Sequence, residues 1–319
     1  MTAAARLAEE LPSLLTLRQV VETALEGKPE AVELALVALL ARGHLLIEDV
    51  PGVGKTTLAH ALAAAVGGEL RRVQFTSDLL PSDVLGVSVF DHNRSEFVLR
   101  RGPIFANVLL ADEINRASPR TQSALLEAMN EGHVSIDGQT LALPAPFFVI
   151  ATQNPQDFAG TFPLPESQLD RFLLRLRIGY PPTPIEIRLL LEGKTDRVRD
   201  IRPVLDPRRL AALQHEVQHV NLDSALASYL HAIIAATRAS PLLALGASTR
   251  AAISLAHAAR ARALLRRRNY CIADDIHDLA IPVLAHRVRL AAHADGFLPT
   301  REEAESVVHD IVTRVPVPL

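Results

Sequence analysis

Short apolar runs and longer helical patterns alternate over the first 180 residues. Four- to six-residue runs that are mostly apolar predict strands; they lie at 44–48, 71–76, 107–111, 147–152 and 173–178. Strands of this kind are typical of a parallel sheet that is covered on both faces. Helical patterns occupy 29–42, 55–66 and 118–131, and the last begins with Ser118 as N-cap and Pro119 at the first helical position. The pattern predicts an α/β domain.

Two segments break this alternation and predict β-hairpins. In 86–100, two apolar runs flank a polar stretch that extends from Asp91 to Glu96. In 133–143, the dipeptide Asp137-Gly138 separates two alternating runs, and Asp-Gly favours a tight hairpin turn. Both hairpins are therefore expected as insertions into the α/β domain.

The prolines around residue 182 mark the end of this domain, because Tyr180-Pro-Pro-Thr-Pro184 can continue neither a helix nor a central strand. Beyond it the pattern is helical, and candidate helix starts lie at Asp206, Asp223, Ser248 or Thr249, and Thr300. Pro282 is expected to kink a helix around 274–292. The chain is thus divided into an α/β core at 1–180, a linker at 181–200 and an all-helical domain at 201–319.

Composition limits the class of protein. No apolar run approaches the ~20 residues that cross a bilayer, and the N-terminus does not resemble a secretory signal. Cys271 is the only cysteine, so no intrachain disulfide forms, as is usual in the cytoplasm, where we expect this protein. The net charge of −3 argues against a generic nucleic-acid binder. The scattered histidines, among them His215 and His219, suggest no ligand set, so no structural metal is expected.

The segment 44–57 carries the most specific chemistry. Its apolar run leads into a Pro/Gly loop, and a helix restarts at Lys55. Backbone N–H groups of such a loop cradle phosphate oxygens at the helix N-terminus. The predicted nucleotide contacts come from the consecutive residues Pro51, Gly52, Val53, Gly54, Lys55, Thr56 and Thr57. Lys55 would reach the β- and γ-phosphates of ATP, and the Thr56 hydroxyl would bind Mg²⁺.

One position departs from the phosphate-loop pattern G-x-x-x-x-G-K-[ST], because Asp49 stands where the first glycine is expected. The alternative is a turn with an accidental Gly-Lys-Thr, as Gly193-Lys194-Thr195 is. The chain has only three lysines, Lys28, Lys55 and Lys194, among many arginines. A lysine retained at the phosphate position indicates a chemical requirement, since guanidinium does not replace ammonium there.

Two carboxylates, Asp112 and Glu113, end the apolar run 107–111. At the carboxyl end of a parallel strand beside a phosphate loop, Asp112 would hold Mg²⁺ and Glu113 would orient and deprotonate the attacking water. The alternative is a solvated acidic turn. The run 147–152 similarly leads to Asn154, whose amide could bind the γ-phosphate and the water; an Asn that begins a turn before Pro155 is the alternative.

The chain resembles the MoxR family of AAA+ ATPases from about Glu26 to its C-terminus. The residues that carry the resemblance lie at 112–117, 121–129, 151–155 and 164–172. It implies an AAA+ core of P-loop type, with a parallel sheet, flanking helices and hairpin insertions, followed by an all-helical lid. It assigns Lys55 and Thr56 to Walker A, Asp112 and Glu113 to Walker B, and Asn154 to sensor 1. The segments 81–101 and 132–145 resemble the helix-2 insert and the pre-sensor-1 hairpin.

The resemblance also implies roles for two arginines. Arg171 matches the arginine finger that reaches a neighbouring subunit's γ-phosphate; the alternative is a surface pair with Asp170. Arg250 matches sensor 2, expected to touch the phosphate within its own subunit; the alternative is a solvated arginine in the first turn of a helix. Arg116 is a further candidate for the subunit interface. By contrast, Arg266-Arg-Arg268 is interpreted as a solvated helix cap and not as a nucleic-acid site.

These assignments predict a Mg²⁺-dependent ATPase that forms a ring, expected to be a hexamer, with a chaperone-like role. Family resemblance implies protein partners that often carry a von Willebrand A-type domain, membrane contact only through such a partner, and no nucleic acid. The alternatives are a magnesium-chelatase-like ATPase subunit, a nucleic-acid translocase and a scaffold that binds ATP without hydrolysing it.

Overall fold

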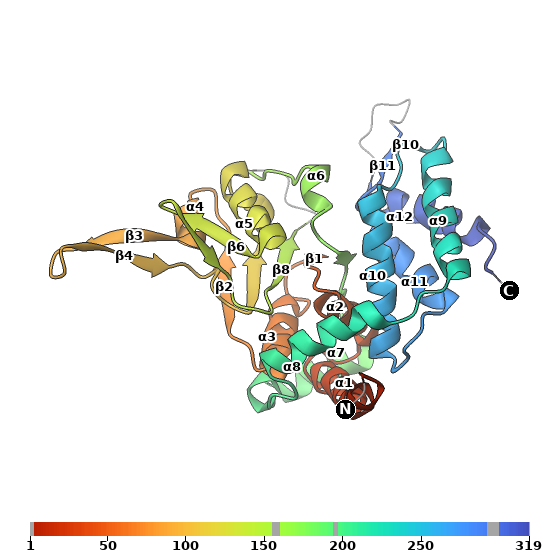
Figure 1. The fold of residues 1–319 in the computed structure, drawn as a ribbon, viewed down its shortest axis with the longest axis horizontal. Coiled ribbons are helices and arrows are strands. Elements are labelled where there is room, and N and C mark those ends of the chain that lie inside the picture. The colour runs from red at the N-terminus through yellow and green to blue at the C-terminus, as the bar shows by residue number, and fades with distance from the viewer. Residues whose placement is uncertain (1–2, 155–159, 194–196, 292–299, 319) are drawn as a thin grey trace.

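The computed structural model describes residues 3–154, 160–193, 197–291 and 300–318 (Figure 1). A five-stranded sheet of order β2-β5-β8-β1-β9 lies at the centre of the first half, and every adjacent pair is parallel. Its strands are β1 Leu45–Glu48, β2 Leu70–Gln74, β5 Val108–Asp112, β8 Phe148–Gln153 and β9 Leu174–Leu176. All five predicted strands are confirmed, with ends that differ by a few residues.

Side chains of each central strand alternate between two hydrophobic clusters, one on each face of the sheet. On β1, Leu45 and Ile47 belong to the larger cluster, whereas Leu46 points into the smaller one. The helices of the larger cluster's face are α1 Ala3–Ala24, α2 Pro29–Leu40 and α3 Lys55–Ala65; those of the smaller cluster's face are α4 Pro81–Leu85 and α5 Pro119–Glu131. Burial on both faces explains why these strands are apolar throughout.

Helix α1 is absent from the sequence-based predictions, as is the short α4, whereas α2, α3 and α5 match them. Its hydrophobic residues Leu14, Leu17 and Val21 are fully buried in the larger cluster. The helix contacts both α2 and α3. It therefore forms part of the core that supports the loop between β1 and α3.

Both predicted hairpins are present. The first pairs β3 Gly86–Asp91 with β4 Glu96–Arg101, and the second pairs β6 His133–Ile136 with β7 Gln139–Ala142. Figure 1 shows the β3–β4 hairpin projecting far from the body of the protein. Its Phe97 side chain is 73% exposed.

The second half is helical, as predicted, with two differences. Its elements are α8 Pro207–Glu216, η3 Val217–His219, α9 Ser224–Ala239, α10 Thr249–Leu265, α11 Ala273–Leu284 and α12 Arg301–Arg314. The helix expected around 274–292 is shorter than predicted, because α11 ends at Leu284. Beyond it, β11 Arg289–Leu290 pairs with β10 Leu243–Leu245. The predicted linker 181–200 contains helices too, α7 Thr183–Glu192 and η2 Arg197–Asp200.

The helix caps read from the sequence are confirmed. Side chains of Ser118, Asp206, Asp223 and Ser248 each accept a hydrogen bond from the backbone N–H three residues on. Thr300 forms the expected capping box with Glu303. Short polar side chains fix these helix starts locally, which is why the sequence could locate them.

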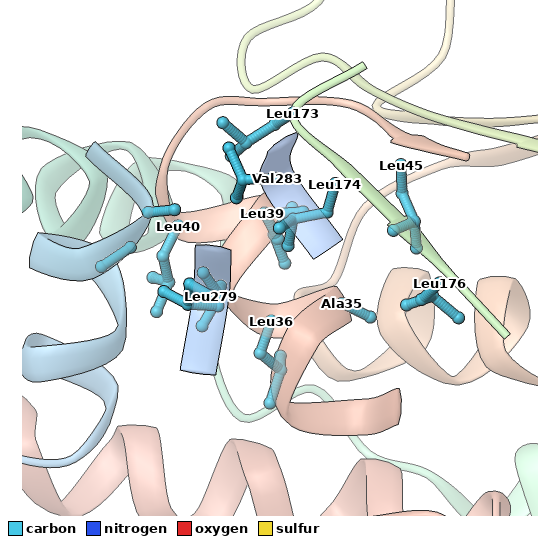
Figure 2. Packing of buried hydrophobic residues seen from close by; sticks show 14 of the residues in the cluster. Ala35, Leu36, Leu39, Leu40, Leu45, Leu173, Leu174, Leu176, Leu279 and Val283 are labelled. Atoms are coloured by element: carbon cyan, nitrogen blue, oxygen red, sulfur yellow. The ribbon is translucent and has the colours of Figure 1, made fainter. Parts of the chain in front are cut away.

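The C-terminal helices pack directly on the core and share its larger hydrophobic cluster. Figure 2 shows Leu279 and Val283 of α11 beside Leu39 and Leu40 of α2, with Leu174 of β9 nearby. Helix α10 also contacts α2. The helical domain therefore covers the β9 edge of the sheet. Among the described residues, no helix combines the length and apolar character needed to cross a membrane.

Candidate nucleotide site

The loop between β1 and α3 has the backbone geometry that its glycines permit. Gly52 and Gly54 have φ of +87° and +100°, in the left-handed region that side chains disfavour. A Cβ on Gly54 would lie 2.7 Å from Cδ1 of Leu25. Gly54 is also the N-cap of α3, so the unpaired N–H groups of the helix start at the loop. Both glycines are therefore required for this loop shape.

Asp49 anchors the start of the loop to the end of β9. Its Oδ2 accepts hydrogen bonds from the backbone N–H groups of Ile178 and Gly179, both at 2.7 Å, and its Oδ1 accepts one from Val50 at 2.8 Å. The residue is only 7% exposed. A glycine could not make these contacts, so the departure from the usual pattern gives this loop an additional attachment.

Lys55 is the first residue of α3 and faces the carboxylates of Asp112 and Glu113. Its Nζ donates to the backbone oxygen of Asp49 at 2.7 Å. Burial lowers the pKa of Lys55, while Asp112, Asp49 and Glu113 oppose that shift. The carboxylates keep this partly desolvated ammonium group protonated, and a charge with reduced solvation interacts more strongly with a phosphate that enters the loop.

Asp112 and Glu113 both lie at the carboxyl edge of the sheet, but their contacts differ. Asp112 ends β5 and its Oδ2 pairs with Arg72 of β2 at 2.7 Å. Glu113 has a φ of +56°, and its Oε2 accepts from Gln74 at 2.8 Å and pairs with Arg116 at 2.9 Å. The left-handed backbone of Glu113 turns the chain out of the strand directly after Asp112. Arg116, predicted for a subunit interface, is thus bound to Glu113 in this chain.

Thr152 is a site residue that the sequence analysis missed. It is fully buried on β8; its hydroxyl donates to Oδ1 of Asp112 at 2.5 Å and accepts from the N–H of Glu113 at 2.9 Å. A polar side chain at a core-facing position of an otherwise apolar strand was the available signal. Asn154 lies two residues further, directly after β8 and half-buried at the same edge of the sheet.

A cavity of about 190 Å³ adjoins the loop. The end of α1, the loop, and α7 with the turn before it contribute its apolar lining of Leu25, Val53, Ile185 and Leu189. Thr57 also lines it, whereas Pro51 of the loop is exposed. The sequence analysis missed the α1 and α7 walls, because apolar residues on helices carry no distinctive pattern for a base.

Arg171 and Arg250 lie near the amino ends of the sheet strands, whereas the loop lies at their carboxyl ends. The N–H of Leu173 donates to the backbone oxygen of His44, so Arg171 is beside the start of β1, whereas the loop follows its end. Arg250 donates to Oδ1 of Asn130 at 3.0 Å and lies 3.6 Å from Asp170. The structure therefore corrects the expectation that Arg250 touches the phosphate of its own subunit: it brings Arg250 beside Arg171 instead.

The two arginines share a cavity of about 320 Å³ that is supported by Arg287, another residue the sequence analysis missed. Arg287 pairs with the Asp170 carboxylate at 2.9 Å and donates to the backbone oxygens of Asp170 and Phe172. Burial lowers the pKa of Arg287 to about 10, partly offset by Asp170. Asp170 is thus bound by other arginines, and Arg171 has no ion pair with it. No described residue forms an ion pair with Arg171, so its side chain remains available for an external partner.

The run from Arg266 to Arg268 is not a solvated cap, contrary to the expectation. Arg266 pairs with the buried Glu33 at 2.9 Å, and Arg268 makes two 2.7 Å hydrogen bonds to the fully buried Asp275. Two of its three charges are therefore used inside the protein.

One group of side chains among the described residues could ligate a metal ion, although the sequence analysis saw no ligand set. His215, Glu216 and His219 place their ligand atoms within 4.8 Å of one another. Both histidines are exposed, and the group lies at the end of α8, on the second half of the chain. It is therefore separate from the loop residues and from the carboxylates at the end of β5.

Comparisons with known proteins agree with the fold of an α/β core followed by a helical domain. Residues 44–174 match the family model described as ATPase family associated with various cellular activities (AAA), and residues 235–311 match the AAA lid domain. The uncharacterized protein YeaC of Bacillus subtilis is 49% identical over 92% of this chain and 91% of its own length. Chaperone MoxR1 of Mycobacterium tuberculosis is 40% identical, over 92% of this chain and 79% of its own.

A solved structure is similar over almost the entire chain. The crystal structure of a Cytophaga hutchinsonii protein provisionally described as an ATPase superposes with a TM-score of 0.89 at 31% identity. The match covers 99% of this chain and 98% of that protein.

Proposed function

Because this chain belongs to the MoxR family of AAA+ ATPases, we propose that it works as a ring in which each ATP is hydrolysed between two subunits. The chain is an ATPase, and the loop between β1 and α3 is the proposed nucleotide site. One observation carries the further step: the loop, Asp112 and Glu113 occupy one edge of the sheet, whereas Arg171 and Arg250 occupy the other. No single copy brings these two sets together.

The residues at the carboxyl edge perform binding and proton transfer. Backbone N–H groups of the loop and Lys55 bind the phosphates, and the cavity lined by Leu25 and Ile185 takes the base. The Glu113 carboxylate orients and deprotonates the attacking water once it has released Gln74 and Arg116. Asn154 would bind the same water and the γ-phosphate from the end of β8.

The hard oxygen ligands of this edge suit Mg²⁺. The Thr56 hydroxyl and the Asp112 carboxylate are the donor types that this ion prefers, and Thr152 already orients the carboxylate. When bound, Mg²⁺ neutralises charge on the phosphate oxygens. Arg72 holds the other oxygen of Asp112, so a bound ion would compete with that arginine.

The amino edge would complete a neighbouring subunit's site. Arg171 is the proposed finger, because its side chain is available and the turn that carries it is fixed by Arg287. Arg250 lies beside it and would reach the same neighbouring phosphate. An arginine supplied in this way can accelerate phosphoryl transfer 10³–10⁵-fold. We propose six subunits for the ring, as the family resemblance implies.

The work of the ring is proposed to be remodelling of a protein client, since a similar protein is named a chaperone. The projecting β3–β4 hairpin, with exposed Phe97 and Phe90, offers an apolar surface for such a contact (Figure 1). A client with a von Willebrand A-type domain is the specific proposal.

We further propose a cytoplasmic location and the division into a core at 1–180, a linker at 181–200 and a lid at 201–319.

A mixing experiment tests the shared site. Arg171→Ala and Glu113→Gln should each lack ATPase activity, but mixed rings should regain part of it, because Arg171→Ala sites receive a finger from Glu113→Gln neighbours. No recovery in rings shown to be mixed would contradict catalysis across subunits. Stimulation of the wild-type ATPase by double-stranded DNA with a steep salt dependence would favour a translocase instead.

A further inference from the structure

Glu48 links the phosphate loop to the last helix of the lid. It is the final residue of β1, directly before Asp49, and its side chain is 13% exposed. Arg301, the first residue of α12, donates from Nη1 to Oε2 of Glu48 at 3.0 Å. The same nitrogen lies 3.3 Å from the backbone oxygen of Glu48, which also accepts. One arginine of the lid thus holds both the side chain and the main chain at the base of the loop.

Two further charged residues complete this contact. Arg175 of β9 approaches Glu48 at 3.6 Å and Glu305 of α12 at 3.8 Å. Arg301 also donates to Glu305 at 2.5 Å. Burial lowers the pKa of Arg175, and Glu48 counteracts this shift. In such a desolvated group each charge depends on its partners. Among the described residues, removal of Arg301 would leave Glu48 with only the longer ion pair to Arg175.

From Glu48 the chain of contacts reaches the Walker A lysine. The next residue, Asp49, is bound through its carboxylate to the end of β9 and through its backbone oxygen to Nζ of Lys55. The start of the loop is therefore held by the end of β9 and by β8, which act on Asp49, and by α12, which acts on Glu48. These contacts fix the direction in which the chain leaves β1.

We propose that Arg301 is a positioning residue for ATP binding, which acts through Glu48 on the orientation of the phosphate loop. The inference rests on the nucleotide binding that the proposed function places at this loop, but not on hydrolysis, on the ring or on its client. It assigns the lid a role within the subunit that differs from that of Arg250. Since the loop must match the phosphates closely, a loss of this support should weaken nucleotide binding more than it slows the chemical step.

Arg177 provides a matched control. It also lies at the end of β9 and forms an ion pair with α12, through Glu302. With Glu48 it has only a longer-range electrostatic attraction and no described hydrogen bond or ion pair. Its loss removes a link between the same two elements without touching the base of the loop. A purely structural role of Arg301 would therefore make the two variants behave alike.

The test compares Arg301→Gln, Arg301→Lys, Glu48→Gln and Arg177→Gln by steady-state ATPase assay and by direct binding of a fluorescent ATP analogue. Arg301→Gln and Glu48→Gln should each raise KM and the analogue's Kd about tenfold, with kcat within threefold of wild type. Combining them should add less than a further threefold, because both remove the same contact. Arg301→Lys should recover part of the binding, and Arg177→Gln should stay within twofold throughout.

Unchanged binding in Arg301→Gln, equal losses in Arg177→Gln, or fully multiplicative effects in the double variant would overturn the proposal. Thermal unfolding without nucleotide shows which variants are folded; if Arg301→Gln is not, Arg301→Lys and Glu48→Gln still decide. A wild-type protein that bound the analogue without hydrolysing ATP would contradict the proposed function and leave the binding comparison valid.

Discussion

The hydroxyl of Thr152 donates to the carboxylate of Asp112 at 2.5 Å, and the same oxygen accepts the backbone N–H of Glu113 at 2.9 Å. A single buried side chain on β8 thus orients both acidic residues at the end of β5. Neither acid is adjacent to Thr152 in sequence, and only the parallel pairing of β5 with β8 brings the three together.

Thr152→Val should therefore lower kcat while the protein stays folded. Valine has the shape of threonine but leaves Asp112 and the Glu113 N–H without a buried partner, which costs about 1–3 kcal/mol. We expect a loss of kcat of tenfold or more, measured by steady-state ATPase assay at saturating ATP and Mg²⁺. Thr152→Ser, which keeps the hydroxyl, should retain most of the activity; an equally inactive Ser variant would contradict the hydrogen-bond explanation.

Lys55→Ala and Glu113→Gln should separate binding from hydrolysis. Without the ammonium group the phosphates lose their nearest cation, so nucleotide binding by Lys55→Ala should fall below detection in calorimetry. Glu113→Gln keeps the shape of the site and should bind ATP with a Kd within about threefold of wild type, while kcat drops at least 10²-fold. Hydrolysis by Glu113→Gln at a wild-type rate would remove Glu113 from the role of base.

Asp49→Gly restores the usual phosphate-loop pattern but should harm this protein. It removes a buried carboxylate that accepts three backbone N–H groups, two of them from the end of β9. We expect a decrease of about 2 kcal/mol or more in the free energy of unfolding, measured by urea denaturation. Asp49→Asn, which keeps one acceptor oxygen, should lose less. A Gly variant as stable as wild type would show that these hydrogen bonds are replaced by water.

Acid should destabilise the fold through His44 and His286. Burial lowers the pKa of His44 to about 4 and that of His286 well below its usual value. For His44, Nδ1 accepts the N–H of Val149 and Nε2 donates to the oxygen of Met129, an arrangement that requires the neutral ring. Because the unfolded chain binds these protons more readily, the stabilisation is complete above about pH 6.5 and is lost as the pH falls toward 4.

The lost free energy is of the order of 3 kcal/mol for His44 alone, if its pKa returns to about 6.5 on unfolding. Urea denaturation at pH 7.5, 6, 5 and 4.5 measures it. His44→Gln cannot titrate, so its free energy of unfolding should fall less steeply over this range than that of wild type. Parallel curves for the two proteins would assign the acid sensitivity to other groups.

Local patterns in the sequence determined much of the fold and half of the site. Apolar strands, helix caps and the Gly-Lys-Thr loop depend on neighbouring residues, so β1, the start of α5 and the position of Lys55 could all be predicted. Helix α1 could not, because nothing in its pattern distinguishes a helix that packs on the core. The β10–β11 pair could not either, since it joins two segments about 45 residues apart.

Only the tertiary structure decided which residues meet. Thr152, Arg287 and Arg301 act across strands or between the two halves of the chain, and contacts at that sequence distance leave no local pattern. The same holds for Arg250: its sequence indicated a phosphate contact, but the packing of α10 placed it beside Arg171, at the opposite edge from Lys55. The sequence thus determined the chemical groups of the ATPase, and the packing of the lid on the core decided which of them lie together at each end of the strands.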